Sequence, residues 1–269
     1  MSYLADYHVH CDLSFDSRTP MADMAAAAVA AGLDEVCFTD HVDLFPSGGD
    51  ERLPYDFAAR APAYAAARQR VGDALRIRRG IELGEPTRDP AYADELLARL
   101  GELDFVIASR HQLSARWGCT DLYYCAAHDE DEARRQIEAY LALLLETARW
   151  GRFSVLGHAT LPLRYMNENN GLHASFDGQE DAMAQLFRTL IERGCGIECN
   201  TNRGHTPLPD EKWLRLYRSL GGEIITLGSD AHSPDYVGCC IRARQELLRA
   251  CGFRYFCTFD RLAPVFHKL

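Results

Sequence analysis

Residues 6–17 read D-Y-H-V-H-C-D-L-S-F-D-S, a stretch in which His8 and His10 end an apolar run and Asp16 follows six residues later. Side chains two apart on a strand point to the same side, so the two histidines would face one neighbour together. Alone, this stretch is either the start of a metal site or a strand that happens to contain histidines. The ends of the other strands decide between these two interpretations.

The rest of the chain alternates short β-rich segments with longer helical ones. Most of the β-rich segments are apolar without clean alternation, which is typical of parallel strands covered on both faces. This alternation predicts one α/β domain over residues 1–269, either a barrel or a doubly wound open sheet. Strands are expected at 3–8, 35–39, 77–82, 104–108, 153–157, 195–199 and 223–228. Helices are expected at 20–31, 56–71, 90–100, 130–150, 178–193, 209–220 and 235–251, before a short C-terminal tail.

The composition is that of an ordinary globular protein, with 47% hydrophobic and 25% charged residues. A formal net charge of −10 disfavours a nucleic-acid polymer or an anionic membrane surface as partner. No apolar run approaches the roughly 20 residues that a membrane span needs. The ten cysteines contain no C-x-x-C pair, and no signal peptide precedes the first strand, so reduced thiols in a cytoplasm are expected.

Histidines and carboxylates recur at or just beyond the carboxyl ends of the expected strands. In a parallel barrel these ends converge on one face, where active sites lie. Imidazole nitrogens and carboxylate oxygens suit zinc, iron and manganese. Each residue has an ordinary alternative, such as a loop histidine or a helix cap, but together they indicate a metal centre. The nine candidate ligands are His8, His10, Asp16, His41, Glu82, His111, His158, Asp230 and His232.

The order of these motifs resembles the PHP (polymerase and histidinol phosphatase) superfamily. The matching stretches are H-V-H at 8–10, T-D-H at 39–41, G-I-E at 80–82, S-R-H at 109–111, G-H at 157–158 and G-S-D-A-H at 228–232. Chain length and the last of these stretches are most similar to stand-alone histidinol-phosphate phosphatases. The resemblance implies a distorted (β/α)7 barrel, similar to a TIM barrel, with three divalent metal ions at the C-terminal ends of the strands.

The resemblance also implies how the ligands would be shared among the three ions. One ion would be held by His8, His10, Glu82 and Asp230. Glu82 would bridge to a second ion held by His111 and His158, and a third would be held by Asp16, His41 and His232. In some family members a histidine takes the place of Asp16, and the aspartate here bears on whether zinc, iron or manganese is preferred.

Three divalent ions would leave the site cationic inside an acidic chain, which suits a phosphate dianion. Clustered ions can activate a water and clamp both oxygens of an in-line displacement, so no serine or cysteine nucleophile is required. Asp230 and His232 are the expected catalytic residues, with Asp230 passing a proton to the leaving alcohol. By resemblance to the phosphatase branch, Arg164, Arg203 and Asn200 are expected to bind substrate phosphate, because arginine forks match phosphate geometry.

The expected reaction is hydrolysis of L-histidinol phosphate to L-histidinol and phosphate, a step of histidine biosynthesis. Alternatives are another PHP-type phosphoesterase acting on nucleotides, oligonucleotides or phosphotyrosine, and a non-catalytic metal-binding protein. A metal-dependent amidohydrolase shares the barrel and the H-x-H pair, but that group typically uses a barrel-wall lysine. The only lysines, Lys212 and Lys268, follow no expected strand.

Overall fold

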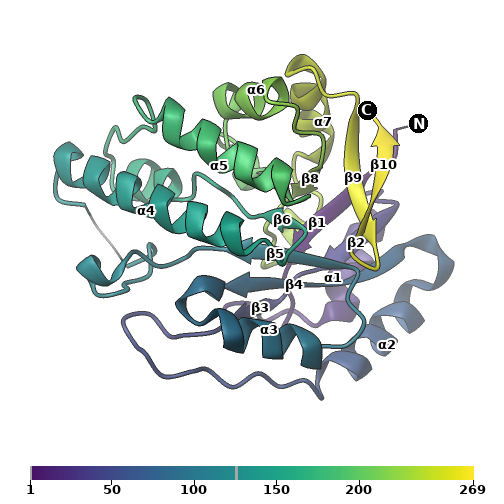
Figure 1. The fold of residues 1–269 in the computed structure, drawn as a ribbon. Coiled ribbons are helices and arrows are strands. Elements are labelled where there is room, and N and C mark those ends of the chain that lie inside the picture. The colour runs from purple at the N-terminus through teal and green to yellow at the C-terminus, as the bar shows by residue number, and fades with distance from the viewer. Residues whose placement is uncertain (1, 125–126) are drawn as a thin grey trace.

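The computed structural model describes residues 2–124 and 127–269 and shows parallel strands in the order β1-β2-β4-β5-β6-β7-β8 (Figure 1). The sequence predicted each of these strands to within two residues at either end. The strands are β1 (Ala5–Val9), β2 (Glu35–Phe38), β4 (Arg76–Gly84), β5 (Phe105–Ser109), β6 (Val155–Leu156), β7 (Gly196–Asn200) and β8 (Ile225–Gly228).

The first and last strands of this order meet and nearly close the barrel. Val9 forms a parallel bridge with Ala231, just beyond β8. The backbone N–H of His10 donates to Ala231 O at 2.9 Å, and that of Asp230 donates to His8 O at 2.8 Å. These bonds confirm the distorted seven-stranded barrel and exclude the open sheet.

Helices between the strands cover the outside of the barrel (Figure 1). In the described part of the chain, no helix is both long and apolar enough to cross a membrane. Among the helices, the start of α7 differs most from the prediction. Gly238 and Cys240 adopt left-handed conformations that interrupt a helix expected from residue 235. The helices are α1 (Met21–Ala30), α2 (Arg60–Val71), α3 (Pro90–Arg99), α4 (Glu130–Trp150), α5 (Glu180–Glu192), α6 (Glu211–Ser219) and α7 (Ile241–Ala250).

Local sequence explains the length of α4, the longest of these helices. The Asp129 side chain accepts a hydrogen bond from the Glu132 N–H at 2.7 Å and caps the first turn, which is acidic as the helix dipole favours. Gly151 ends the helix with φ 65°, a conformation that glycine adopts without strain. Ile137, Tyr140 and Leu144 bury one face of α4 in the core.

Three strands were not predicted. The short β3 (His41–Asp43) pairs with β4 so that His41 lies opposite Glu82 and Asp43 opposite Gly84. The expected C-terminal tail is instead an antiparallel hairpin of β9 (Tyr255–Asp260) and β10 (Ala263–Lys268). It packs on β1, where the Tyr7 hydroxyl accepts a hydrogen bond from the Phe259 N–H at 2.8 Å.

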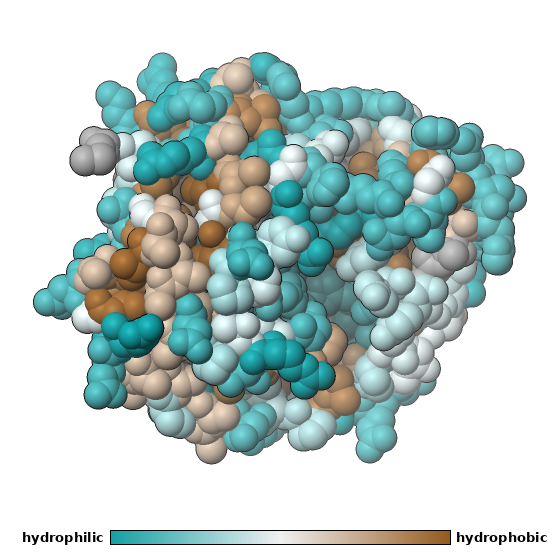
Figure 2. Space-filling model, turned by 180° about the vertical axis from the view of Figure 1, so that it is seen from behind, coloured by the Kyte–Doolittle hydropathy of each residue, from teal (hydrophilic) through white to brown (hydrophobic). Residues whose placement is uncertain are grey.

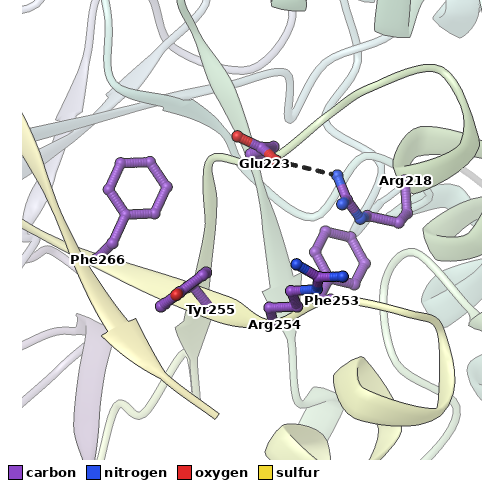
Figure 3. A pocket seen from close by; sticks show the side chains of 6 residues that line it. All are labelled: Arg218, Glu223, Phe253, Arg254, Tyr255 and Phe266. Atoms are coloured by element: carbon purple, nitrogen blue, oxygen red, sulfur yellow. Dashed lines mark hydrogen bonds and ion pairs between the residues drawn. The ribbon is translucent and has the colours of Figure 1, made fainter.

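A cavity of about 340 Å³ lies between this hairpin and α6 (Figure 3). Arg218 Nη1 pairs with Glu223 Oε1 at 3.4 Å on one side of it. Glu223 precedes β8, whereas Asp230 and His232 follow that strand, so the cavity is at the opposite end of the barrel from the predicted metal ligands. Its lining residues are Arg218, Glu223, Phe253, Arg254, Tyr255 and Phe266.

Candidate metal centre

The structure brings the nine candidate ligands together at the carboxyl ends of the strands. The donor atoms of eight of them, together with Asp43, form groups of three in which all the atoms lie within 4.8 Å of one another, and Asp16 contacts this cluster through His232. Because these residues come from segments far apart in the chain, only the barrel can place them together. The groups are His8–His10–Glu82, His8–His158–Asp230, Glu82–His111–His158, His10–His41–His232, and His41–Asp43–His111.

Glu82 is at the middle of the cluster. Its Oε1 lies 3.0 Å from His111 Nε2 and 2.9 Å from His158 Nε2. Its Oε2 lies 3.0 Å from His8 Nε2 and 3.2 Å from His41 Nδ1. The two carboxylate oxygens therefore face different histidines, which is the geometry that a carboxylate bridging two ions requires.

Asp16 and Asp230 provide carboxylates on the other sides of the cluster. Asp16 Oδ2 lies 2.9 Å from His232 Nε2 and 3.4 Å from His41 Nε2. Asp230 Oδ1 lies 3.4 Å from His10 Nε2. The backbone of Asp230 has φ 59°, which is uncommon for a residue with a side chain. Asp16 thus faces His232, which Glu82 does not contact, whereas His41 and His10 each face a second carboxylate besides Glu82.

Neighbouring polar groups fix the orientation of several of these histidines. His8 Nδ1 lies 2.7 Å from Glu198 Oε1, which leaves His8 Nε2 to face Glu82. His10 Nδ1 lies 3.1 Å from Ser14 Oγ, and His232 Nδ1 lies 2.9 Å from the Asp230 carbonyl. Such partners set the tautomer and ring orientation of metal-binding histidines. Glu198 is not among the site residues predicted from the sequence, and the fold shows that it orients the ring of His8.

The protonation states of His10 and of two carboxylates suit metal binding. Nearby carboxylates outweigh burial and raise the pKa of four other rings, so an ion would displace protons from His8, His41, His111 and His232. Burial, together with the nearby His232 and His41, lowers the pKa of His10 to about 3, so its imidazole is neutral at pH 7. Burial alone would raise the pKa of the Glu82 carboxyl, but His8, His41 and His111 outweigh it and hold that pKa well below its usual value. For Asp230, burial likewise raises the pKa of the carboxyl, but His8 and Arg164 outweigh burial and hold that pKa well below its usual range.

Unpaired buried nitrogens show that the cluster fits a cation. Among residues 2–124 and 127–269, His10 Nε2 and His41 Nδ1 are buried without a hydrogen-bond partner. A buried polar atom left unpaired costs about 1–3 kcal/mol, which a bound ion would relieve. Buried histidine and carboxylate donors in groups of this size fit divalent ions such as zinc, iron or manganese.

The cluster lies at the bottom of a cavity of about 730 Å³. Figure 2 shows a face of the molecule that is hollowed near its middle and mostly hydrophilic around the hollow. Tyr123, Tyr165, Asp121 and Glu168 also line the cavity. The cavity is large enough for a small polar molecule, and its carboxylates favour one with a positive group.

The three predicted phosphate-binding residues are differently placed. Arg164 lines the cavity and donates through Nη1 to Asp230 Oδ2 at 2.9 Å. Arg203 also lines it, with its guanidinium 5.3 Å from the centre of the Tyr236 ring. Asn200 is fully buried, and its Oδ1 accepts from Arg164 Nη2 at 3.1 Å. The structure therefore connects Asn200 to the cavity through Arg164.

Comparisons with known proteins agree with this arrangement. A model of the PHP domain family matches residues 6–202. The chain is 27% identical to a histidinol-phosphatase of Lactococcus lactis over 95% of this chain and 94% of that protein. It is 28% identical to a probable histidinol-phosphatase of Deinococcus radiodurans, over 88% of this chain and 90% of that protein. The same fold is found in the crystal structure of histidinol phosphate phosphatase from Lactococcus lactis, which is in complex with zinc, L-histidinol and phosphate. The TM-score is 0.78 at 23% sequence identity, and the match covers 97% of this chain and 98% of that one.

Proposed function

Because the chain belongs to the PHP domain family, we propose that it is a metal-dependent phosphatase that hydrolyses L-histidinol phosphate to L-histidinol and phosphate. The observation that carries this proposal is the meeting of Glu82 with histidines from several strands directly beneath a cavity that Arg164 also lines. The relatives named above support the same reaction, since the chain matches them over nearly their whole lengths.

Three divalent ions are proposed, held by the ligand sets that the family resemblance implies. When bound, such ions would supply positive charge for the phosphate and lower the pKa of a water so that it can attack near neutral pH. The groups of donor atoms around Glu82 and Asp230, and the contacts of Asp16 with His232 and His41, support these sets. Zinc, iron and manganese all suit these donors.

Asp230 and His232 are the proposed catalytic residues among the ligands. Asp230 lines the cavity next to Arg164, where the leaving alcohol of a bound phosphomonoester would lie, and we assign it the transfer of a proton to that alcohol. Asp230→Asn should reduce kcat by orders of magnitude, because an amide cannot carry that proton. Wild-type kinetics in a fully metal-loaded Asp230→Asn protein would reject this role.

Arg164 and Arg203 are proposed to bind the phosphate, and Asn200 to hold Arg164 in place. Three of the guanidinium N–H groups of Arg164 are used by Asp230, Asn200 and Asn202, at 2.9, 3.1 and 2.8 Å. A guanidinium carries five such donors, so two remain for a ligand in the cavity. A planar pair of donors matches two phosphate oxygens.

The cavity carboxylates support a substrate with a positive group. Asp121 and Glu168 line the cavity but belong to none of the proposed metal sets. Histidinol phosphate carries an amine and an imidazole that could pair with such carboxylates, whereas a nucleotide or phosphotyrosine presents more negative charge to them. The same cavity lined by Tyr123 and Tyr165 offers aromatic faces to an imidazole ring.

A panel of substrates tests the proposal. Phosphate release would be measured for the protein loaded with manganese, iron or zinc, using histidinol phosphate, nucleotides, an oligonucleotide and phosphotyrosine. The highest kcat/KM is expected for histidinol phosphate. A clear preference for another phosphoester would reject the substrate but keep the phosphatase, and inactivity on every phosphoester with metal bound would reject the phosphatase itself.

The proposed compartment is the cytoplasm. All the described cysteines are free thiols, including the neighbours Cys239 and Cys240, whose sulfur atoms are 3.7 Å apart. Free thiols in this number are typical of a reducing compartment. The formal charge of −10 supports a small phosphomonoester rather than a nucleic-acid polymer as the partner.

A further inference from the structure

Asp43 is a cavity carboxylate to which the proposed metal sets give no role. It ends β3, two residues after His41, so both side chains lie on the same face of that strand. Its Oδ1 lies 3.5 Å from His111 Nδ1 and 4.0 Å from His41 Nδ1. One carboxylate oxygen therefore faces a ring nitrogen of two different candidate ligands.

The two histidines turn their other ring nitrogens toward the cluster. His111 Nε2 lies 3.0 Å from Glu82 Oε1, and His41 Nε2 lies 3.4 Å from Asp16 Oδ2. A metal-binding histidine carries its proton on the nitrogen that does not bind the ion, and that N–H needs an acceptor. The carboxylate that faces His111 Nδ1 is Asp43, at 3.5 Å, whereas His41 Nδ1 lies nearer to Glu82 Oε2, at 3.2 Å, than to Asp43.

The surroundings of Asp43 hold its carboxylate beside His41 and His111. Among the described residues, Asp43 Oδ1 and His41 Nδ1 are both buried and without a hydrogen-bond partner, although they face each other. Gly84 lies opposite Asp43 in the β3–β4 register, and a methyl group at residue 84 would overlap the Asp43 carboxylate. A side chain at residue 84 would therefore displace the group that faces His41 and His111.

We propose that Asp43 is a positioning residue that accepts the Nδ1 proton of His111 and so fixes which nitrogen His111 presents to a metal ion. The same carboxylate lies beside His41, which belongs to a different proposed ion site. This inference rests on the proposed metal-dependent function. Replacing such a partner typically weakens metal binding by about 10- to 100-fold.

The test is a zinc titration of the metal-free full-length protein against a chromophoric chelator. Asp43→Ala should weaken zinc binding about 10- to 100-fold, and Asp43→Asn, which keeps an acceptor oxygen without the charge, should weaken it less. Gly84→Ala should act in the same direction by displacing the carboxylate. Once Asp43 is already alanine, adding Gly84→Ala should cause little further loss, since there is no carboxylate left to displace.

Asp50→Asn is the matched control, because Asp50 follows β3 on the same loop and its side chain is 97% exposed. Its zinc affinity should equal that of the wild type. A second readout is the NMR signal of the His111 Nδ1–H in the zinc-loaded protein, which should be slow to exchange in the wild type and lost in Asp43→Ala. The thermal stability of each metal-free variant shows whether it folds; should Asp43→Ala not fold, Asp43→Asn and Gly84→Ala decide.

The outcomes separate this inference from the proposed function. A wild-type protein that binds no zinc, manganese or iron would overturn the proposed function, and this inference with it. A wild type that binds zinc, with Asp43 and Gly84 variants that bind it equally well and keep the His111 signal, would overturn the role of Asp43 alone.

Discussion

Replacing Arg164 gives a quantitative test of how the cavity would hold phosphate. Its guanidinium has two N–H donors left after the bonds to Asp230, Asn200 and Asn202. Each hydrogen bond to a charged group contributes about 1.5–3 kcal/mol, so losing two costs about 3–6 kcal/mol. At about 1.4 kcal/mol for each tenfold, Arg164→Ala should lower kcat/KM by about 10²- to 10⁴-fold.

The assay is steady-state phosphate release by the metal-loaded enzyme, with metal content measured for each variant because Arg164 also contacts Asp230. Arg164→Lys keeps the charge but loses the fork, so its loss should be smaller. The exposed Arg134 of α4 provides a control, Arg134→Ala, with unchanged kinetics. The loss should be equal for histidinol phosphate and a simple aryl phosphate, since both present the same phosphate. A loss under about threefold with metal retained would refute the reasoning, because it corresponds to less than one hydrogen bond to a charged group.

Three further predictions concern stability. Glu198→Gln should lower the free energy of unfolding by about 1–3 kcal/mol, because the amide N–H of the glutamine would face either His8 Nδ1 or the backbone N–H of His158. Urea unfolding measures this change, and Glu192→Gln, at an exposed residue, should leave the free energy of unfolding unchanged. A chelator that removes bound ions should lower Tm. Adding ions back at about 100 times Kd should raise the free energy of unfolding by about 2.7 kcal/mol, and an unchanged Tm would contradict an ion-stabilised site. Burial raises the thiol pKa of Cys195 to about 11 and that of Cys257 to about 12. The unfolded thiols therefore lose protons first, and stability should fall by about 1.4 kcal/mol per pH unit for each thiol above about pH 9. Urea unfolding above about pH 9 should show a shallower decline of the free energy of unfolding with pH for Cys257→Ala than for the wild type. An equal decline would count against a raised thiol pKa at Cys257.

The barrel strands and the candidate ligands could be predicted because one pattern marks both. A buried apolar run indicates a parallel strand, and a histidine or carboxylate directly after it lies at the end where such strands converge. His8 with His10 and Asp230 with His232 follow this pattern at the two strands that meet at the closure of the barrel. Their convergence then follows from the topology alone, without knowledge of any side-chain contact.

The features that were missed depend on neighbours distant in the chain or on unusual turns. β3 has three residues, too few to show a period, and its pairing with β4 determines where Asp43 lies. The β9–β10 hairpin turns at Arg261 and Leu262, with φ 48° and 64°, where a sequence would signal a turn by asparagine or glycine. The burial of Asn200 against Arg164 likewise depends on a residue 36 positions away, so its role in phosphate binding stays a prediction.

The closure between β1 and β8 has a consequence for how the protein is made. His8 and His10 emerge in synthesis long before Asp230 and His232. An ion held by His8, His10 and Asp230 would join the two strands at the closure, and its site would be complete only after the last parallel strand has formed. Loading of that ion would therefore indicate a finished barrel, and a nascent chain that ends before Asp230 could hold histidines but not the complete site.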